Sequence, residues 1–280
     1  MITLFAILFA GSLIAGLLGS MTGLGGGIII IPMLTIGTGV DIRYAIGTSL
    51  VAVIATSSGA AAAFVKTGIT NIRIGMFLEI ATTLGAIGGA ALALIAPTNV
   101  IAVLFGLVLL YSSADSFINR AKIPPPYIEP SDSSRPLLSR LLKLDSSYPS
   151  TIGEVFYNVF NPIWGFLTMI LAGILSGLLG IGSGAFKVVA MDSIMKIPYK
   201  VSTATSNFMI GVTAAASAGI YLGRGYIDPV LSMPVVLGVI LGAALGARTL
   251  MISKTKKLRV VFAFVIATLA FRMLYEGLTK

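Results

Sequence analysis

The chain has 280 residues, of which 56% are apolar and only 10% charged, and its mean hydropathy is +1.00. This composition excludes an ordinary soluble domain and predicts an all-α protein that crosses the cell membrane several times. Cysteine and histidine are absent, so disulfides, thiol chemistry and histidine-based proton transfer or metal binding are excluded. We therefore expect neither an enzyme nor a bound cofactor or metal.

The net charge of +9 comes from basic residues scattered in the loops between apolar segments. Such residues orient a membrane protein beside anionic lipid, so we expect no nucleic-acid partner.

The first apolar region is too long to be one membrane-spanning helix. Residues 3 to 36 would form a helix of about 50 Å, whereas the hydrocarbon core is about 30 Å thick. The glycine-rich stretch from Gly23 to Gly27 is where a helix would break. We therefore predict a helix over 3–21 and a re-entrant half-helix over 28–36. Three longer segments follow, at 44–64, 74–95 and 99–117.

The next stretch, residues 119–155, has a different composition. It holds six prolines and charges of both signs, which hydrocarbon does not accommodate. This predicts a polar cytoplasmic linker between a first transmembrane repeat, 1–118, and a second, 156–280.

The second repeat matches the first at a fixed offset of 157 residues. Gly23, Gly25 and Gly27 correspond to glycines at 180, 182 and 184, and Thr48-Ser49 corresponds to a Thr-Ser pair at 205–206. Apolar composition alone would not align glycines and hydroxyls in this way. The corresponding segments of the second half are 163–180, 185–195, 201–222, 229–250 and 258–276.

Two topologies are open, with about eight or about ten membrane segments. If the short pieces turn back, each half has an odd number of segments and the repeats are inverted. Fourteen basic residues then share one face and four the other, as expected of a cytoplasmic face. The fourteen are Lys66, Arg73, Arg120, Lys122, Arg135, Arg140, Lys143, Lys196, Lys200, Arg248, Lys254, Lys256, Lys257 and Arg259. With four spans per half the repeats are parallel, and this asymmetry almost disappears.

The two glycine-rich loops predict an anion-binding site. A half-helix that starts after such a loop presents free backbone N–H groups and a partial positive charge. The residues expected there are Gly25, Gly26 and Gly27 in the first half and Gly182, Ser183 and Gly184 in the second. Glycines four apart on one helix, such as Gly85 and Gly89 or Gly242 and Gly246, are more typical of close helix packing.

Lys187 is a lone lysine in an apolar run, which is costly in a membrane and calls for a specific role. The alternatives are contact with the anion, pairing with Asp192, or extension of the side chain to an interface.

Polar side chains elsewhere complete the expected site. Thr48, Ser49, Thr205, Ser206 and Asn207 could orient oxyanions, or could simply bond backbone carbonyls. The acidic residues nearest the spans, which could carry a coupling proton or mark the ends of spans, are Glu79, Asp115 and Asp192.

The chain resembles the TauE/SafE family of sulfite and sulfonate exporters, also called the toluene-sulfonate uptake permease family. The similar elements in the first half are Gly16-Leu-Leu-Gly19, Gly23-Leu-Gly-Gly-Gly27 with Pro32, and Ala45-Ile-Gly-Thr-Ser49. Those in the second half are the run from Gly177 to Gly184, Lys187-Val188, the string from Ser202 to Ser217, and Gly223-Arg-Gly-Tyr-Ile-Asp-Pro229. Ser183 stands where the family usually has glycine, and Val189 where it often has proline.

The resemblance implies a secondary carrier that moves sulfite, sulfoacetate or a related sulfur-containing anion, commonly outward. The residues themselves indicate only an anion. The alternatives are a passive anion channel, which would show neither counterflow nor saturation, and a carrier for a different small anion.

Overall fold

The computed structural model describes residues 2–22, 25–118, 137–150, 153–252 and 256–279. The first half contains α1 (Ile2–Thr22), α2 (Gly27–Thr38), α3 (Ile42–Lys66), α4 (Ile72–Ile95) and α5 (Thr98–Ile118). Between the halves lie α6 (Leu137–Leu141) and a hairpin of β1 (Ser146–Ser150) and β2 (Gly153–Tyr157). The second half contains α7 (Pro162–Leu179), α8 (Gly184–Val189) with its π-helical extension η2 (Ala190–Ile194), α9 (Tyr199–Gly223), α10 (Pro229–Ile252) and α11 (Lys256–Thr279). Every apolar segment predicted from the sequence is helical, with ends that differ by a few residues.

The helices have the lengths and surfaces of a membrane protein. Within the described residues, five are long and apolar enough to cross a bilayer. They are Thr3–Ser20 of α1, all of α3, α4 and α7, and Pro229–Gly246 of α10. Large apolar side chains point outward, and Leu84 on α4 and Leu171 on α7 are each 63% exposed. Polar side chains such as Thr82, Ser206 and Thr213 are buried instead, so the outer surface suits lipid, and the mostly apolar interior holds the polar groups.

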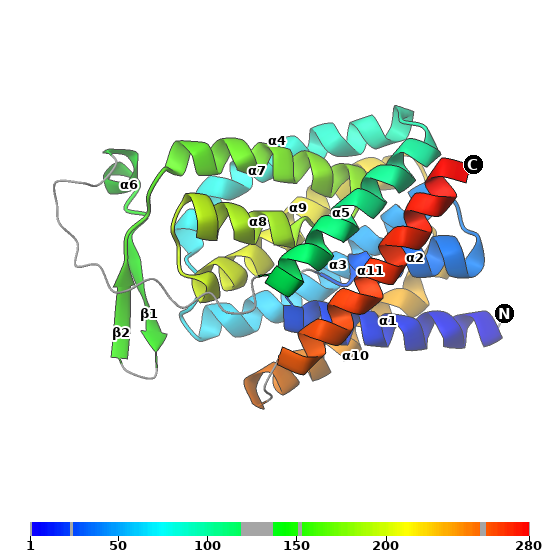
Figure 1. The fold of residues 1–280 in the computed structure, drawn as a ribbon, viewed down its shortest axis with the longest axis horizontal. Helices are drawn as coiled ribbons and strands as arrows, with labels where there is room; N and C mark the ends of the chain where they lie inside the picture. Colours follow the sequence, from blue (N-terminus) through cyan, green and yellow to red (C-terminus); the bar gives the residue numbers. More distant parts are fainter. Residues whose placement is uncertain (1, 23–24, 119–136, 151–152, 253–255, 280) are drawn as a thin grey trace.

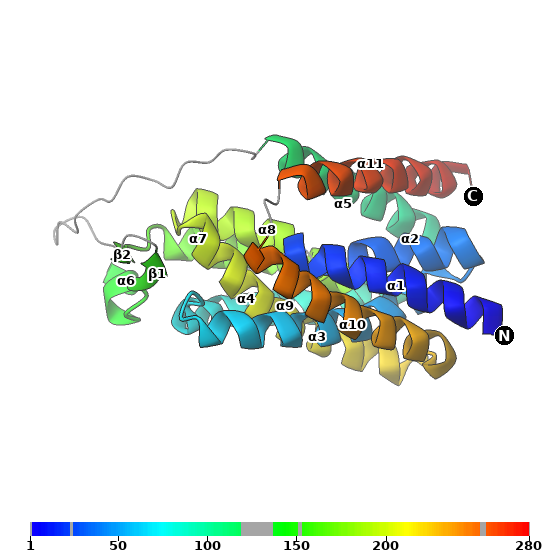
Figure 2. The same ribbon diagram turned by 90° about the horizontal axis from the view of Figure 1, so that it is seen from below.

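The two halves are interlocked rather than side by side. Helix α1 packs along α10, and its counterpart α7 packs along α4. The remaining long helices contact their own counterparts, α3 with α9 and α5 with α11. In Figure 1, α1 runs inward from the end that carries the N-terminus, whereas α7 starts beside the β-hairpin and runs the opposite way. Figure 2 shows the same arrangement from a perpendicular direction, with both termini at one end.

Glycines allow the closest of these helix contacts. A methyl group at Gly89 of α4 would collide with the carbonyl oxygen of Ile174 on α7, and one at Gly246 of α10 would collide with the carbonyl of Leu17 on α1. Gly85 with Ile170 and Gly242 with Leu13 repeat this relation. The contacts in the two halves correspond at the 157-residue offset, and they confirm the packing role expected of these glycines.

The glycine-rich break after α1 reverses the chain. Gly19, near the end of α1, lies against the backbone of Gly25 and Gly26, so α2 folds back along α1. With 12 residues, α2 is shorter than the roughly 20 residues needed to span a bilayer. It ends at Gly39, whose φ of 70° is in the left-handed region. A short helix packed against α1 therefore stands where the sequence predicts a re-entrant half-helix.

Part of the predicted linker is folded against the helices, which sequence reasoning did not anticipate. Asn71 caps α4 by accepting a hydrogen bond from Ile74 N (3.1 Å), and its amide donates to the carbonyl of Leu144 (3.0 Å) and to the Tyr157 hydroxyl (2.8 Å). Burial raises the pKa of Tyr157 to about 12. The hairpin thus covers the end of the molecule at which α4 begins.

The glycine contacts predict a position-specific effect on stability. Gly89→Leu should lower the thermal unfolding temperature of the detergent-purified protein, because overpacking a tight contact typically costs about 1–3 kcal/mol. Gly88→Leu is the matched control, since Gly88 is exposed and a Cβ atom added there meets nothing within 4 Å. Equal melting of the two variants would contradict the proposed close contact between α4 and α7.

Candidate functional site

The two glycine-rich loops lie next to each other, beside the crossing of α3 and α9. The Ser49 hydroxyl on α3 donates a hydrogen bond to the carbonyl of Gly180 in the other half (2.9 Å). Val53, one turn further along α3, is adjacent to both Gly25 and Gly182. The loops predicted from separate parts of the sequence are therefore brought together, and their glycines are buried.

Both short helices begin there without a side-chain cap. Gly26 precedes α2 and Ser183 precedes α8, and neither caps its helix through a side chain. Ser183 has a φ of 47°, in the left-handed region that a serine rarely adopts. Its hydroxyl is buried and has no hydrogen-bond partner. A buried polar donor without a partner is costly, and such groups are often found at binding sites.

Lys187 lies four residues after Ser183 and is fully buried. Its Nζ donates a hydrogen bond to the Thr213 hydroxyl on α9 (2.5 Å) and lies 4.0 Å from Glu79 Oε2 on α4. Extension of this side chain to an interface is thus not what the structure shows. The acidic group beside it comes from the other half of the chain, so the charge pair joins the two repeats.

Thr213 bridges the two charged groups. Its hydroxyl donates to Glu79 Oε1 (2.7 Å) or to the carbonyl of Met209 (2.9 Å), while it accepts from Lys187. The Thr83 hydroxyl also donates to Glu79 Oε1 (3.1 Å). The second carboxylate oxygen, Oε2, is buried and has no hydrogen-bond partner. We call Glu79, Thr213 and Lys187 the charged triad.

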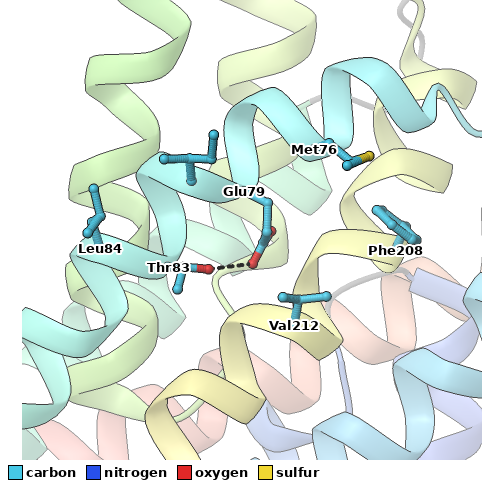
Figure 3. Close-up of a pocket in the computed structure, with 7 residues that line it drawn as sticks. Met76, Glu79, Thr83, Leu84, Phe208 and Val212 are labelled. Atoms are coloured by element: carbon cyan, nitrogen blue, oxygen red, sulfur yellow. Dashed lines mark hydrogen bonds between the residues drawn. The ribbon is translucent and has the colours of Figure 1, made fainter.

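A pocket of ≈ 410 Å³ opens beside this triad between α4 and α9. Figure 3 shows Glu79 and Thr83 at its wall, with Phe208 and Val212 contributed by α9 and Met76 and Leu84 by α4. Most of the lining is apolar, and several of these side chains belong to the outward-facing surface of the helices. Among the described residues that line it, Glu79 is the one that is acidic.

The other residues expected at the site have different partners. Thr205 accepts a hydrogen bond from Asn71 N (3.1 Å), and Thr48 accepts one from Ser232 (3.4 Å). Asn207 bonds the carbonyl of Thr203 within α9 (3.0 Å). Ser206 is the exception, because it donates to the carbonyl of Gly184 at the second loop (3.3 Å). Thr205 thus contacts the start of α4, Thr48 contacts α10, and Asn207 bonds within its own helix.

The two remaining acidic candidates lie on η2 and α5. Asp192 is half-buried in η2. Asp115 belongs to α5, and its side chain lies outside the described set.

Sequence reasoning missed Thr213, although a signal for it exists. At the 157-residue offset Thr213 corresponds to Thr56, so the hydroxyl is present in both halves. The charged members have apolar counterparts, since Lys187 corresponds to Ile30 and Glu79 to Val236. Two oppositely charged residues whose counterparts in the other repeat are both apolar are typical of an ion pair.

Comparison with known proteins agrees with this membrane architecture. The model of the sulfite exporter TauE/SafE family matches residues 8–273. The chain is 28% identical to the probable membrane transporter protein YunE of Bacillus subtilis over 281 residues, which cover 98% of each chain. It is 26% identical to the probable membrane transporter protein YdhB of the same organism, with 86% of this chain and 87% of that one covered.

A further relative is the probable membrane transporter protein ORF9 of a Sinorhizobium species, 24% identical over 98% of this chain and 93% of that one. No solved structure shows a significant match. The family model covers nearly the whole chain, both glycine-rich loops and the charged triad. The protein therefore belongs to the sulfite exporter TauE/SafE family and is a multi-pass membrane protein.

Proposed function

We propose that the protein is a secondary transporter that exports sulfite or a related sulfur-containing anion by alternating access. The observation that carries this proposal is the buried lysine of the charged triad, one helical turn from the two joined glycine-rich loops. A membrane protein of a transporter family rarely retains an intramembrane lysine without a role in the substrate path.

The proposed anion site lies between the loops. Its backbone donors are the N–H groups at Gly25, Gly26, Gly27, Gly182, Ser183 and Gly184, and its side-chain donors are Ser183 and Lys187. Ser206 and Ser49 line the same region and hold the second loop through their hydrogen bonds to the carbonyls of Gly184 and Gly180. The unpartnered hydroxyl of Ser183 supports this assignment, because it has a donor to offer to an oxyanion. Thr48, Thr205 and Asn207 would act indirectly, by holding α3 and α9 in place.

Alternating access follows from the interlocked halves. We propose that the repeats are inverted, with ten membrane segments that include the two short helices. The opposite directions of α1 and α7 and the reversal between α1 and α2 support this (Figure 1). In such transporters one repeat rocks against the other around a site near the midplane.

A passive channel is the second candidate, and a carrier for another small anion is the third. Burial of Lys187 and of the loop glycines supports a gated carrier, since a channel needs a continuous path past its selective groups. The sulfur chemistry comes from the family and not from any side chain described above.

Counterflow of labelled sulfite in proteoliposomes tests the transport proposal. Wild-type protein should show saturable counterflow, with sulfoacetate, sulfate and acetate tested as competitors. Lys187→Gln should reduce it about 30-fold or more, because removing one member of a buried charged contact costs about 2 kcal/mol or more. Lys200→Gln, which changes an exposed lysine at the start of α9, should leave counterflow unchanged.

Folding must be separated from transport in this test. Lys187→Gln leaves Glu79 without its neighbouring cation, so the double variant Lys187→Gln/Glu79→Gln is included to remove both charges. The double variant should melt close to wild type and still fail to exchange. Full counterflow in a stable Lys187→Gln variant would remove the lysine from the substrate path, and flux without saturation would favour a channel.

Single cysteines test the inverted topology, since the natural sequence contains none. Cysteines at positions 140 and 255 should react with a membrane-impermeant maleimide from the same, cytoplasmic side. The inverted arrangement predicts this because both basic clusters then share one face. Labelling from opposite sides would instead indicate parallel repeats with four spans each.

A further inference from the structure

The charged triad breaks the symmetry of the two repeats. Its counterpart at the 157-residue offset consists of Ile30, Thr56 and Val236, with no charge. The hydroxyls share one kind of partner in both halves, since Thr56 donates to the carbonyl of Ala52 (2.7 Å) and the carbonyl of Met209 (2.9 Å) is the alternative acceptor to Glu79 for Thr213. The fold therefore tolerates an apolar pair at these positions, and the charges serve a purpose other than packing.

We infer that Glu79 is an internal anion that holds Lys187 when substrate is absent, and that a substrate anion binds Lys187 only as Glu79 takes up a proton. One proton would then accompany each anion through the transport cycle. This inference rests on the proposed function, because it identifies the coupling ion of that same site.

The geometry of the pair suits exchange. Lys187 Nζ and Glu79 Oε2 are 4.0 Å apart, beyond hydrogen-bond distance, and their closest link passes through the Thr213 hydroxyl. A structural buried ion pair is stable only when its remaining oxygen atoms are hydrogen-bonded. Here Oε2 has no hydrogen-bond partner. The lysine is therefore neutralised without being fully bound by the carboxylate.

Charge balance in the membrane requires the proton. With Glu79 ionised, the Lys187–Glu79 pair has no net charge, and an added substrate anion would leave an uncompensated negative charge in a buried site. Proton uptake by Glu79 restores neutrality for a singly charged anion, which becomes the new partner of Lys187. For a dianion such as sulfoacetate, it removes one of the two uncompensated negative charges. The neutral carboxyl group keeps its hydrogen bonds, because the hydroxyls of Thr83 and Thr213 can accept as well as donate.

Few other charged groups in the helices around Glu79 could take up the proton in its place. Among the described elements packed on α4, helix α7 carries no charged residue, and α9 carries only Lys200 in its first turn. The segment formed by α8 and η2 contributes Lys187 and Asp192. On α4 itself, Arg73 lies at the start of the helix and donates to the carbonyl of Lys143 (3.2 Å).

The test is isothermal titration calorimetry of the full-length purified protein with sulfite and with sulfoacetate. Each titration is repeated in two buffers of different ionisation enthalpy, which gives the number of protons taken up per anion bound. By proton linkage, wild type should take up about one proton more per anion than Glu79→Gln. Any proton exchange by the anion itself is common to both proteins and cancels in the difference.

The affinities provide a second readout. Glu79→Gln removes the internal competitor, so it should bind the anion about tenfold or more tightly at neutral pH, with little further dependence on pH. Glu154→Gln is the control, since that carboxylate lies exposed in the hairpin with Ser147. It should bind and take up protons like wild type.

The outcomes separate this inference from the proposed function. If neither anion binds wild type, the proposed substrate class fails and the coupling falls with it. If an anion binds but Glu79→Gln takes up as many protons as wild type, the coupling by Glu79 is overturned and the transport proposal stands. If Glu79→Gln does not fold, the number of protons that wild type takes up per sulfoacetate bound at pH 7 tests the inference. The sulfonate and carboxylate groups of sulfoacetate are already ionised at that pH. Binding without proton uptake would overturn the inference.

Discussion

A lysine buried in a membrane protein must be neutralised, and this requirement joins the two halves of the chain. Lys187 stands at the second glycine-rich loop, whereas the carboxylate 4.0 Å from it belongs to α4 of the first half. The hydroxyl between them comes from α9. Neither repeat could bury its own charge at an acceptable energetic cost. The interlocked packing of the helices is therefore a condition for the site as well as a feature of the fold.

The glycine contacts make that interlocking possible. Within the membrane there is little hydrophobic driving force between helices, so association depends on close van der Waals packing and on polar contacts. Gly85 and Gly89 bring α4 against α7, which places Glu79 on the side of α4 that faces α9 and α8. Substitution of either glycine would move the carboxylate as well as the helix. The contact between α4 and α7 thus helps to position the charged triad.

Much of this could be predicted from the sequence, because its strongest signals are local. Apolar length gives the helices, and the glycine-rich stretch gives the interruption between α1 and α2. The identity of Lys187's neighbour is not local, since it depends on which faces of α4, α8 and α9 meet. The same limit applies to Thr205, because its hydrogen bond from Asn71 N depends on how α9 meets the start of α4. The β-hairpin was missed because prolines and mixed charges resemble an unstructured linker.

The difference between the halves is the most informative feature of a duplicated chain. Positions that the fold requires are repeated in both halves, as with Gly85 and Gly242, or Thr56 and Thr213. Under the proposed transport mechanism, positions that the chemistry requires need to occur only once, because a single substrate path needs one buried cation. Lys187 and Glu79 are paired in space and are both replaced by apolar residues at the offset positions. Loss of symmetry at two contacting positions at once is expected when they form one functional unit, since either charge alone would be a buried ion without a partner.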